Sequence, residues 1–180
     1  GSRLNRKTNS GKKTIKVLAE KGYRDNRMHF VVIDHSIPEF DTNAGARHVL
    51  HLLVLLVQLD IRVTYLPYCD NRSPKTGYYI DVLQKKGINV MRIEDSASSW
   101  DSTYWHEWLE CNANDIDCVV MGRPHVADAY MHFARNVMKV DTWYLIHDLH
   151  FLRLKRQALL ERNFSMYRQS RRLKKQEKLI

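Results

Sequence analysis

The stretch that decides the fold is MHFVVIDHSIPEFDTNAGAR, residues 28–47. Its first six residues are mostly apolar, with β-branched and aromatic side chains that favour a buried strand, and Asp34 and His35 follow at once. A polar loop then leads to Ala44, where a leucine-rich helical pattern begins. A strand that ends in polar residues and continues into a helix is the repeating unit of a layered α/β domain.

The same unit recurs along the chain. We predict strands at 29–34, 62–67, 89–93, 117–121 and 142–146, and helices at 44–59, 78–86, within 98–112, and at 126–138, 149–162 and from 164 onward. The apolar residues of the first helix cover most of its surface, so we expect it to be well buried. Alternating strands and helices of this length predict βαβ units, a parallel sheet flanked by helices, and so a Rossmann-like α/β domain.

The charge of the chain is concentrated at its two ends. Residues 1–27 carry nine Lys and Arg against two acids, and residues 151–180 carry ten against two. Residues 28–150 are acidic, with ten against sixteen. We therefore divide the chain into a basic lead-in or linker (1–27), a Rossmann-like domain (28–163) and a basic C-terminal helix (164–180).

Composition also limits the cell compartment in which the protein can work and the kinds of partner it can bind. Cys69, Cys111 and Cys118 form no C-x-x-C pair, which is typical of thiols in a reducing compartment. The longest apolar run, 49–57, is about half the length that spans a bilayer. We expect a cytoplasmic protein. Its basic tail is a solvated helix face, or it contacts the anionic inner face of a membrane or a missing partner domain.

Polar residues follow three of the predicted strands. They comprise Asp34 and His35 with the loop that follows them to Arg47, the turn Gly122–His125 and the segment His147–His150. Because ligands bind beyond the carboxyl ends of the strands in open α/β sheets, we expect one rim to hold all three. The first loop points N–H groups and the positive end of a helix at an anion or a hydroxyl-rich ligand, or it is an ordinary capped loop. It contains neither G-x-G-x-x-G nor a Walker loop.

The other two segments carry their own alternatives. Arg123 and His125 could hold a phosphate or a sugar hydroxyl, or they are surface residues near a helix start. Asp148 could orient His147 or act as a base, or it caps a helix beside solvated histidines. We predict no metal site at His147, Asp148 and His150, because no cysteine or second carboxylate joins them.

Three longer segments carry a resemblance to a known family. They are VVIDHSIPEFDTNAGARHVLHLLVLLVQLDIRVTYLP (31–67), DCVVMGRPHVADAY (117–130) and WYLIHDLHFLRLKRQ (143–157). Together they resemble the N-terminal half of group 1 glycosyltransferases, the retaining GT-B enzymes of family four. Many bacterial members share a strand ending in D-H/R, a P-x-x-D-x-x-(A/S)-G-x-R loop, an R-P-x-x-A turn and a D-L-H-x-x-R segment. The resemblance covers about residues 28–178.

The resemblance implies an activity. Enzymes of this family hold an acceptor mainly on the N-terminal Rossmann-like domain and a nucleotide-sugar on a C-terminal one, and they usually need no metal. We therefore expect the acceptor-side domain of a bacterial hexosyltransferase that moves a sugar from a nucleotide-sugar to a glycan or lipid-linked acceptor, in polysaccharide biosynthesis. The nucleotide-sugar is a co-substrate, and we expect no cofactor. Without the C-terminal donor-binding domain, the chain alone is expected to be inactive.

Matching positions assign roles within the site. Asp41, Gly45 and Arg47 would face the donor phosphates and the acceptor, and Arg123 and His125 would lie on the cleft wall. His147 and Asp148 would act beside the transferred sugar as the catalytic pair, with His150 facing the substrate. Many members carry a histidine at the end of the fourth strand, where this chain has Gly122.

Two other classes of function remain open at this point. The same fold could be a non-catalytic module that binds a protein or a membrane through its basic ends. Nucleic-acid binding through those ends is less favoured, because the rim residues lie in the acidic body of the chain.

Overall fold

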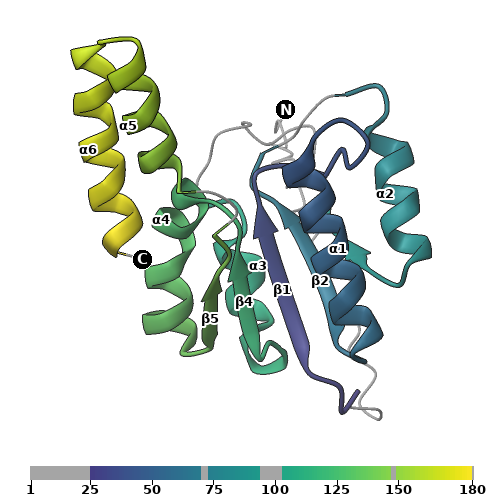
Figure 1. Cartoon of the computed structure of the whole chain (residues 1–180). Coiled ribbons are helices and arrows are strands. Elements are labelled where there is room, and N and C mark those ends of the chain that lie inside the picture. Colours follow the sequence, from purple (N-terminus) through teal and green to yellow (C-terminus); the bar gives the residue numbers. More distant parts are fainter. Residues whose placement is uncertain (1–24, 70–72, 94–102, 147–148, 180) are drawn as a thin grey trace, which may run out of the picture.

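The chain folds around a parallel sheet of five strands. A computed structural model describes residues 25–69, 73–93, 103–146 and 149–179. The strands are β1 (His29–Asp34), β2 (Arg62–Pro67), β3 (Asn89–Val90), β4 (Cys118–Met121) and β5 (Asp141–Tyr144). Their order is β3-β2-β1-β4-β5 and every neighbouring pair is parallel (Figure 1). This is the strand order of a Rossmann-like fold, so the predicted fold class is confirmed.

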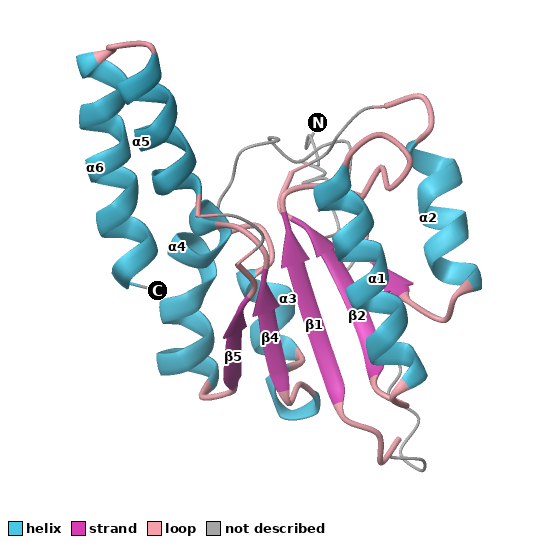
Figure 2. Cartoon of the chain, viewed as in Figure 1, coloured by secondary structure: helices cyan, strands magenta, loops and turns pink. Residues whose placement is uncertain are grey.

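Helices connect the strands and cover the sheet (Figure 2). They are α1 (Ala44–Gln58), α2 (Thr76–Lys85), α3 (His106–Cys111), α4 (Pro124–His132), α5 (His150–Leu160) and α6 (Phe164–Leu179), with a short 3-10 helix at Ala113–Asp115 and a π-helix at Phe133–Met138 that continues α4. The predicted positions of these helices are confirmed to within a few residues. The third strand is shorter than predicted, because β3 is an edge strand that pairs only with β2.

The central strand supplies side chains to both layers of the core. Phe30 and Val32 pack with buried residues of α1 and α2, whereas Val31 and Ile33 pack with those of α3 and α4. Successive side chains of a strand point to opposite faces, so β1 must be apolar at consecutive positions. All six of its residues are buried.

Helix α1 is less buried than its composition predicts. Ala46, Val49, Leu53 and Leu56 form its buried face. Leu55 on the other side is 51% exposed, so the expectation of burial over most of its surface was wrong. A helix that covers an outer face of a sheet contacts it along one stripe only, whatever the composition of its other face.

Helices α5 and α6 form a hairpin that projects from the body of the domain (Figure 1). The small residues Ala158 and Ser170 are buried between them, which allows the two backbones to approach closely. Helix α6 also contacts α4. Within the described ranges, no helix is both long enough and apolar enough to cross a membrane.

A buried histidine anchors the amino end of β1. His29 is 4% exposed, and its Nδ1 lies 2.9 Å from the carbonyl oxygen of Asp115. Its Nε2 lies 2.8 Å from Oγ1 of Thr64. The carbonyl can only accept, so Nδ1 carries the proton and Nε2 accepts from the threonine hydroxyl. Burial lowers the pKa of His29 below its usual value, with a smaller contribution from Arg62.

This histidine predicts a pH dependence of stability. Because its pKa is lower in the folded state, the unfolded chain binds the proton first as the pH falls below about 6.5. The free energy of unfolding should then decrease, with a slope of at most about 1.4 kcal/mol per pH unit from this one group. Urea unfolding at several pH values would measure the slope. His29→Gln should flatten it, and an equal slope in both proteins would contradict the assignment.

Candidate functional site

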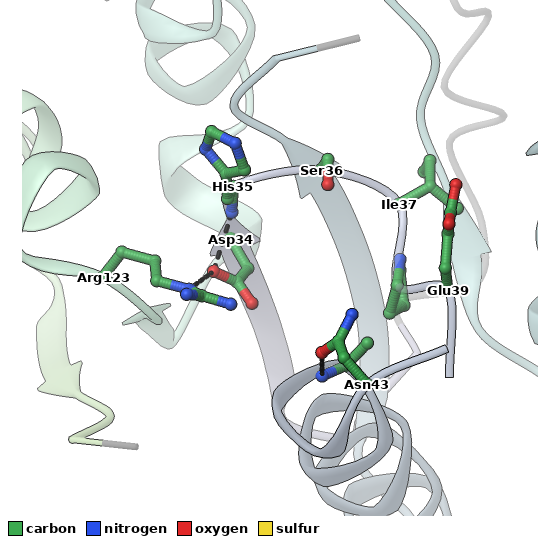
Figure 3. Close-up of a pocket in the computed structure, with 9 residues that line it drawn as sticks. Asp34, His35, Ser36, Ile37, Glu39, Asn43 and Arg123 are labelled. Carbon is green, nitrogen blue, oxygen red and sulfur yellow. Dashed lines mark hydrogen bonds and ion pairs between the residues drawn. The ribbon is translucent and has the colours of Figure 1, made fainter. Parts of the chain in front are cut away.

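A pocket lies where the chain changes direction across the sheet. After β1 the chain passes through α1 to β2 on one side, whereas β4 pairs with β1 on the other side. This is the switch point at which open α/β sheets bind ligands. The pocket has a volume of about 280 Å³. It is lined by Asp34, His35, Ser36, Ile37, Pro38, Glu39, Asn43, Ala46 and Arg123 (Figure 3).

Asp34, the last residue of β1, lies at the base of the pocket. The residue is 4% exposed. Its Oδ1 accepts hydrogen bonds from the backbone N–H of His35 at 2.7 Å and from Nε of Arg123 at 3.1 Å. Both hydrogen bonds end on this one oxygen (Figure 3). One carboxylate oxygen of a pocket-lining residue is therefore fixed by the chain.

Arg123 spans the pocket from β4 toward α1. It has extended backbone geometry directly before α4, where Pro124 takes the first helical position. A Cβ built on Gly45 would lie 3.6 Å from Nη2 of Arg123, so the guanidinium lies beside the first turn of α1. Because the ion pair with Asp34 uses Nε, the terminal nitrogens retain N–H groups for an outside acceptor.

Gly122 makes room for this ion pair. A Cβ at this position would lie 2.8 Å from Cγ and 2.9 Å from Oδ1 of Asp34. These distances are shorter than van der Waals contact, so any side chain here would displace the carboxylate. The lack of a side chain at position 122 therefore allows the Asp34 carboxylate to occupy this position.

Two hydrogen bonds fix the loop after β1, one near its start and one at its end. The Tyr65 hydroxyl donates to the carbonyl oxygen of Ser36 at 2.6 Å, and burial raises the pKa of Tyr65 well above its usual value. The hydroxyl therefore stays protonated as a donor. At the end of the loop, Oδ1 of Asn43 accepts from the N–H of Ala46 at 2.8 Å and caps α1.

Two histidines meet at the edge of the pocket. Nδ1 of His35 lies 3.2 Å from Nε2 of His125, and the rings are nearly perpendicular. One ring nitrogen must donate and the other accept, so at least one imidazole is neutral. The Cys69 thiol donates to the carbonyl oxygen of His35 at 2.9 Å. Among the described residues, no group of three His, Cys, Asp or Glu side chains could hold a metal ion.

The structure brings together only part of the predicted site. Arg123 lines the pocket, Gly45 lies beside Arg123, and His125 lies beside His35, another lining residue. Asp41 instead accepts a hydrogen bond from the Tyr79 hydroxyl at 2.5 Å, which raises the pKa of that tyrosine to about 12. Nε of Arg47 donates to the carbonyl oxygen of Phe40 at 3.3 Å. Neither Asp41 nor Arg47 lines the pocket.

The third predicted segment, His147–His150, lies largely outside the described residues. His147 and Asp148 lie outside the described residues, and so does the side chain of His150, whose backbone begins α5. Their roles beside the transferred sugar stay predictions. The roles assigned from the sequence omitted Asp34, His35, Glu39 and Asn43. Asp34 and His35 were expected at the rim, because they directly follow the first predicted strand, but they were given no role there.

Comparison with known proteins adds little to this geometry. No protein-family profile and no curated protein sequence matches the chain. A leucoanthocyanidin reductase from Vitis vinifera, solved with NADPH, aligns at 16% identity and a TM-score of 0.45 over 82% of this chain and 45% of the reductase. The chain thus spans less than half of its length. A Vibrio parahaemolyticus protein of unknown function aligns at 10% identity and a TM-score of 0.39, over 68% of this chain and 83% of that protein.

The contact at Gly122 gives a direct test of the pocket. Gly122→Ala should destabilise the fold by about 1–3 kcal/mol, because the new methyl group overpacks a buried site. It should also shift the NMR signals of Asp34, His35 and Arg123. Chemical unfolding and amide spectra would measure both effects. Gly77→Ala is the matched control, since a Cβ there meets nothing within 4 Å. Equal behaviour of the two variants would contradict the described packing.

Proposed function

We propose that the chain is the acceptor-side domain of a glycosyltransferase, which holds a hydroxyl group of a glycan or lipid-linked acceptor for transfer of a sugar from a nucleotide-sugar. The observation that carries the proposal is the Asp34 carboxylate, buried at the switch point with one oxygen held by two donors. Such a carboxylate is oriented before any ligand arrives, and its second oxygen can accept a hydrogen bond from a hydroxyl group.

The polar groups around the pocket suit hydroxyl groups better than an isolated anion. The lining contains two carboxylates, Asp34 and Glu39, against one guanidinium, Arg123. A hydroxyl group both donates and accepts, so it can bind between Asp34 and the terminal nitrogens of Arg123. A bare phosphate in the same position would also meet the carboxylates. The pocket volume of about 280 Å³ lies just below the range of about 300–1,000 Å³ that is usual for small-molecule sites.

The family resemblance supports the same proposal from a different direction. Residues 34–39, Asn43 and Ala46 belong to one of the resembling segments and Arg123 to another, and in the folded chain they line one pocket although the two segments are far apart in sequence. Segments that resemble one family of sugar transferases therefore meet at the place where this fold type binds ligands.

The proposed reaction assigns a limited task to this chain. The acceptor oxygen forms a bond to the anomeric carbon of the donor sugar, and the bond from that carbon to the phosphate oxygen breaks. The hydroxyl proton leaves with the nucleoside diphosphate. Asp34 would orient the acceptor hydroxyl, which contributes through proximity. The N–H groups near Gly45 would face anionic oxygens of the donor. His147 and Asp148 would contact hydroxyl groups of the transferred sugar, and a C-terminal domain would bind the nucleotide.

A titration of the isotope-labelled chain tests the proposal. UDP, GDP, their sugar derivatives and short oligosaccharides would be added separately while amide NMR spectra are recorded. We expect oligosaccharides to shift signals of residues 34–39, 43–46 and Arg123. Asp34→Asn should weaken that binding by about tenfold to a hundredfold, since hydrogen bonds to a charged partner contribute about 1.5–3 kcal/mol.

Asp81→Asn is the matched control, because Asp81 is an exposed carboxylate on α2 outside the pocket. It should leave the affinity unchanged. Arg47→Gln tests the role predicted from sequence, and should weaken nucleotide-sugar binding only if the donor phosphates reach the outer side of α1. Absence of any shift with millimolar saccharide would contradict the proposal and leave the non-catalytic binding module as the better explanation.

A further inference from the structure

The far end of the helical hairpin exposes large apolar side chains. Helix α5 ends at Leu160, and α6 begins at Phe164 after a three-residue turn. Leu159, Leu160 and Phe164 are 62%, 86% and 70% exposed. We call these three residues the hairpin tip. Clustered exposed apolar side chains at one point of a surface mark a site of interaction.

A continuous face of α5 leads from the body to the tip. Side chains at helical spacing border a shallow groove of about 390 Å³ along it: Leu149, Leu152, Arg153, Arg156, Gln157 and Leu160. The face carries three leucines and two arginines, so apolar surface and positive charge lie together. The face is separate from the side of α5 that packs on α6, where Ala158 is 3% exposed.

The hairpin is also the most basic described part of the chain. Residues 151–180 contain ten Lys and Arg and two Glu, a net charge of +8. Residues 28–150 have a net charge of −6. Two of the cations lie over aromatic rings of the hairpin itself, Arg168 over Phe164 at 5.3 Å and Lys174 over Phe151 at 5.6 Å. An anionic surface would therefore attract the hairpin and repel the body.

We propose that the hairpin tip and the groove face of α5 bind the surface of an anionic lipid bilayer. Leu159, Leu160 and Phe164 would enter the boundary between headgroups and acyl chains, and Arg153 and Arg156 would contact lipid phosphates. Leucine beside arginine on an amphipathic helix is the pattern of interfacial binding, in which apolar burial and attraction to anionic lipids add together.

The hairpin tip and the pocket lie toward the same edge of the domain. The tip projects past the carboxyl ends of the strands, on the side of the sheet where the pocket lies (Figure 1). A bilayer at the tip would thus face the pocket edge of the domain. The inference depends on the hairpin alone and stands without the proposed function; if both hold, the acceptor is drawn from the lipid surface.

Vesicle sedimentation with the full chain tests the inference. We expect binding to phosphatidylcholine vesicles that contain phosphatidylglycerol, and little binding to phosphatidylcholine alone. Leu160→Ser with Phe164→Ser should weaken binding by at least about tenfold, because two apolar side chains no longer enter the bilayer. Arg153→Gln and Arg156→Gln should each weaken it by about fivefold, and added salt should weaken it further.

Matched controls in the body of the domain test whether the effect is specific to the hairpin. Leu59→Ser replaces a leucine that is 63% exposed beside α1, and Lys85→Gln removes an exposed cation on α2. Neither should change binding. Full binding by the tip variant would overturn the proposal, and so would equal affinity for neutral and anionic vesicles. Self-association that the tip substitutions abolish, with no vesicle binding, would instead identify a second copy as the partner.

Discussion

The arrangement at the carboxyl edge of the sheet depends on the parallel pairing of β1 with both β2 and β4. This pairing buries every residue of β1 and covers both of its faces with helices. A strand in that position is apolar in its interior, so its polar residues lie at its ends, His29 at the amino end and Asp34 at the carboxyl end. There the chain turns toward α1 on one side while β4 ends on the other. The switch point and its buried carboxylate are thus consequences of one strand lying at the centre.

The ion pair between Asp34 and Arg123 converts this position into a site. It joins the ends of β1 and β4, and it is possible because Gly122 has no side chain. A buried carboxylate without a partner is unfavourable, and the guanidinium compensates its charge while keeping donors for a ligand. The same contact that stabilises the edge of the sheet therefore orients groups toward the pocket. Stability and binding are linked here through a single pair of side chains.

Much of the fold was predictable from the sequence, because strands buried on both faces leave a clear apolar pattern between polar strand ends. The short β3 was not, since edge pairing depends on a neighbour that the local sequence does not specify. Arg123 was predictable as a residue at a strand end. The direction of Asp41 toward Tyr79 was not, because it depends on how α2 packs against the loop. Sequence identifies the edge of the sheet that holds a site more readily than the side chains that point into it.

The distance in sequence between the two halves of the pocket has a consequence for folding. Asp34 and Arg123 are 89 residues apart, and their contact requires β1 and β4 to have paired. Such non-local pairing is slow to form, because the intervening chain must first give up its conformational freedom. During synthesis from the amino end, β1 and β2 emerge long before the cation that completes the site. The pocket is therefore among the last features to assemble, and an incomplete chain presents a carboxylate with no counter-charge.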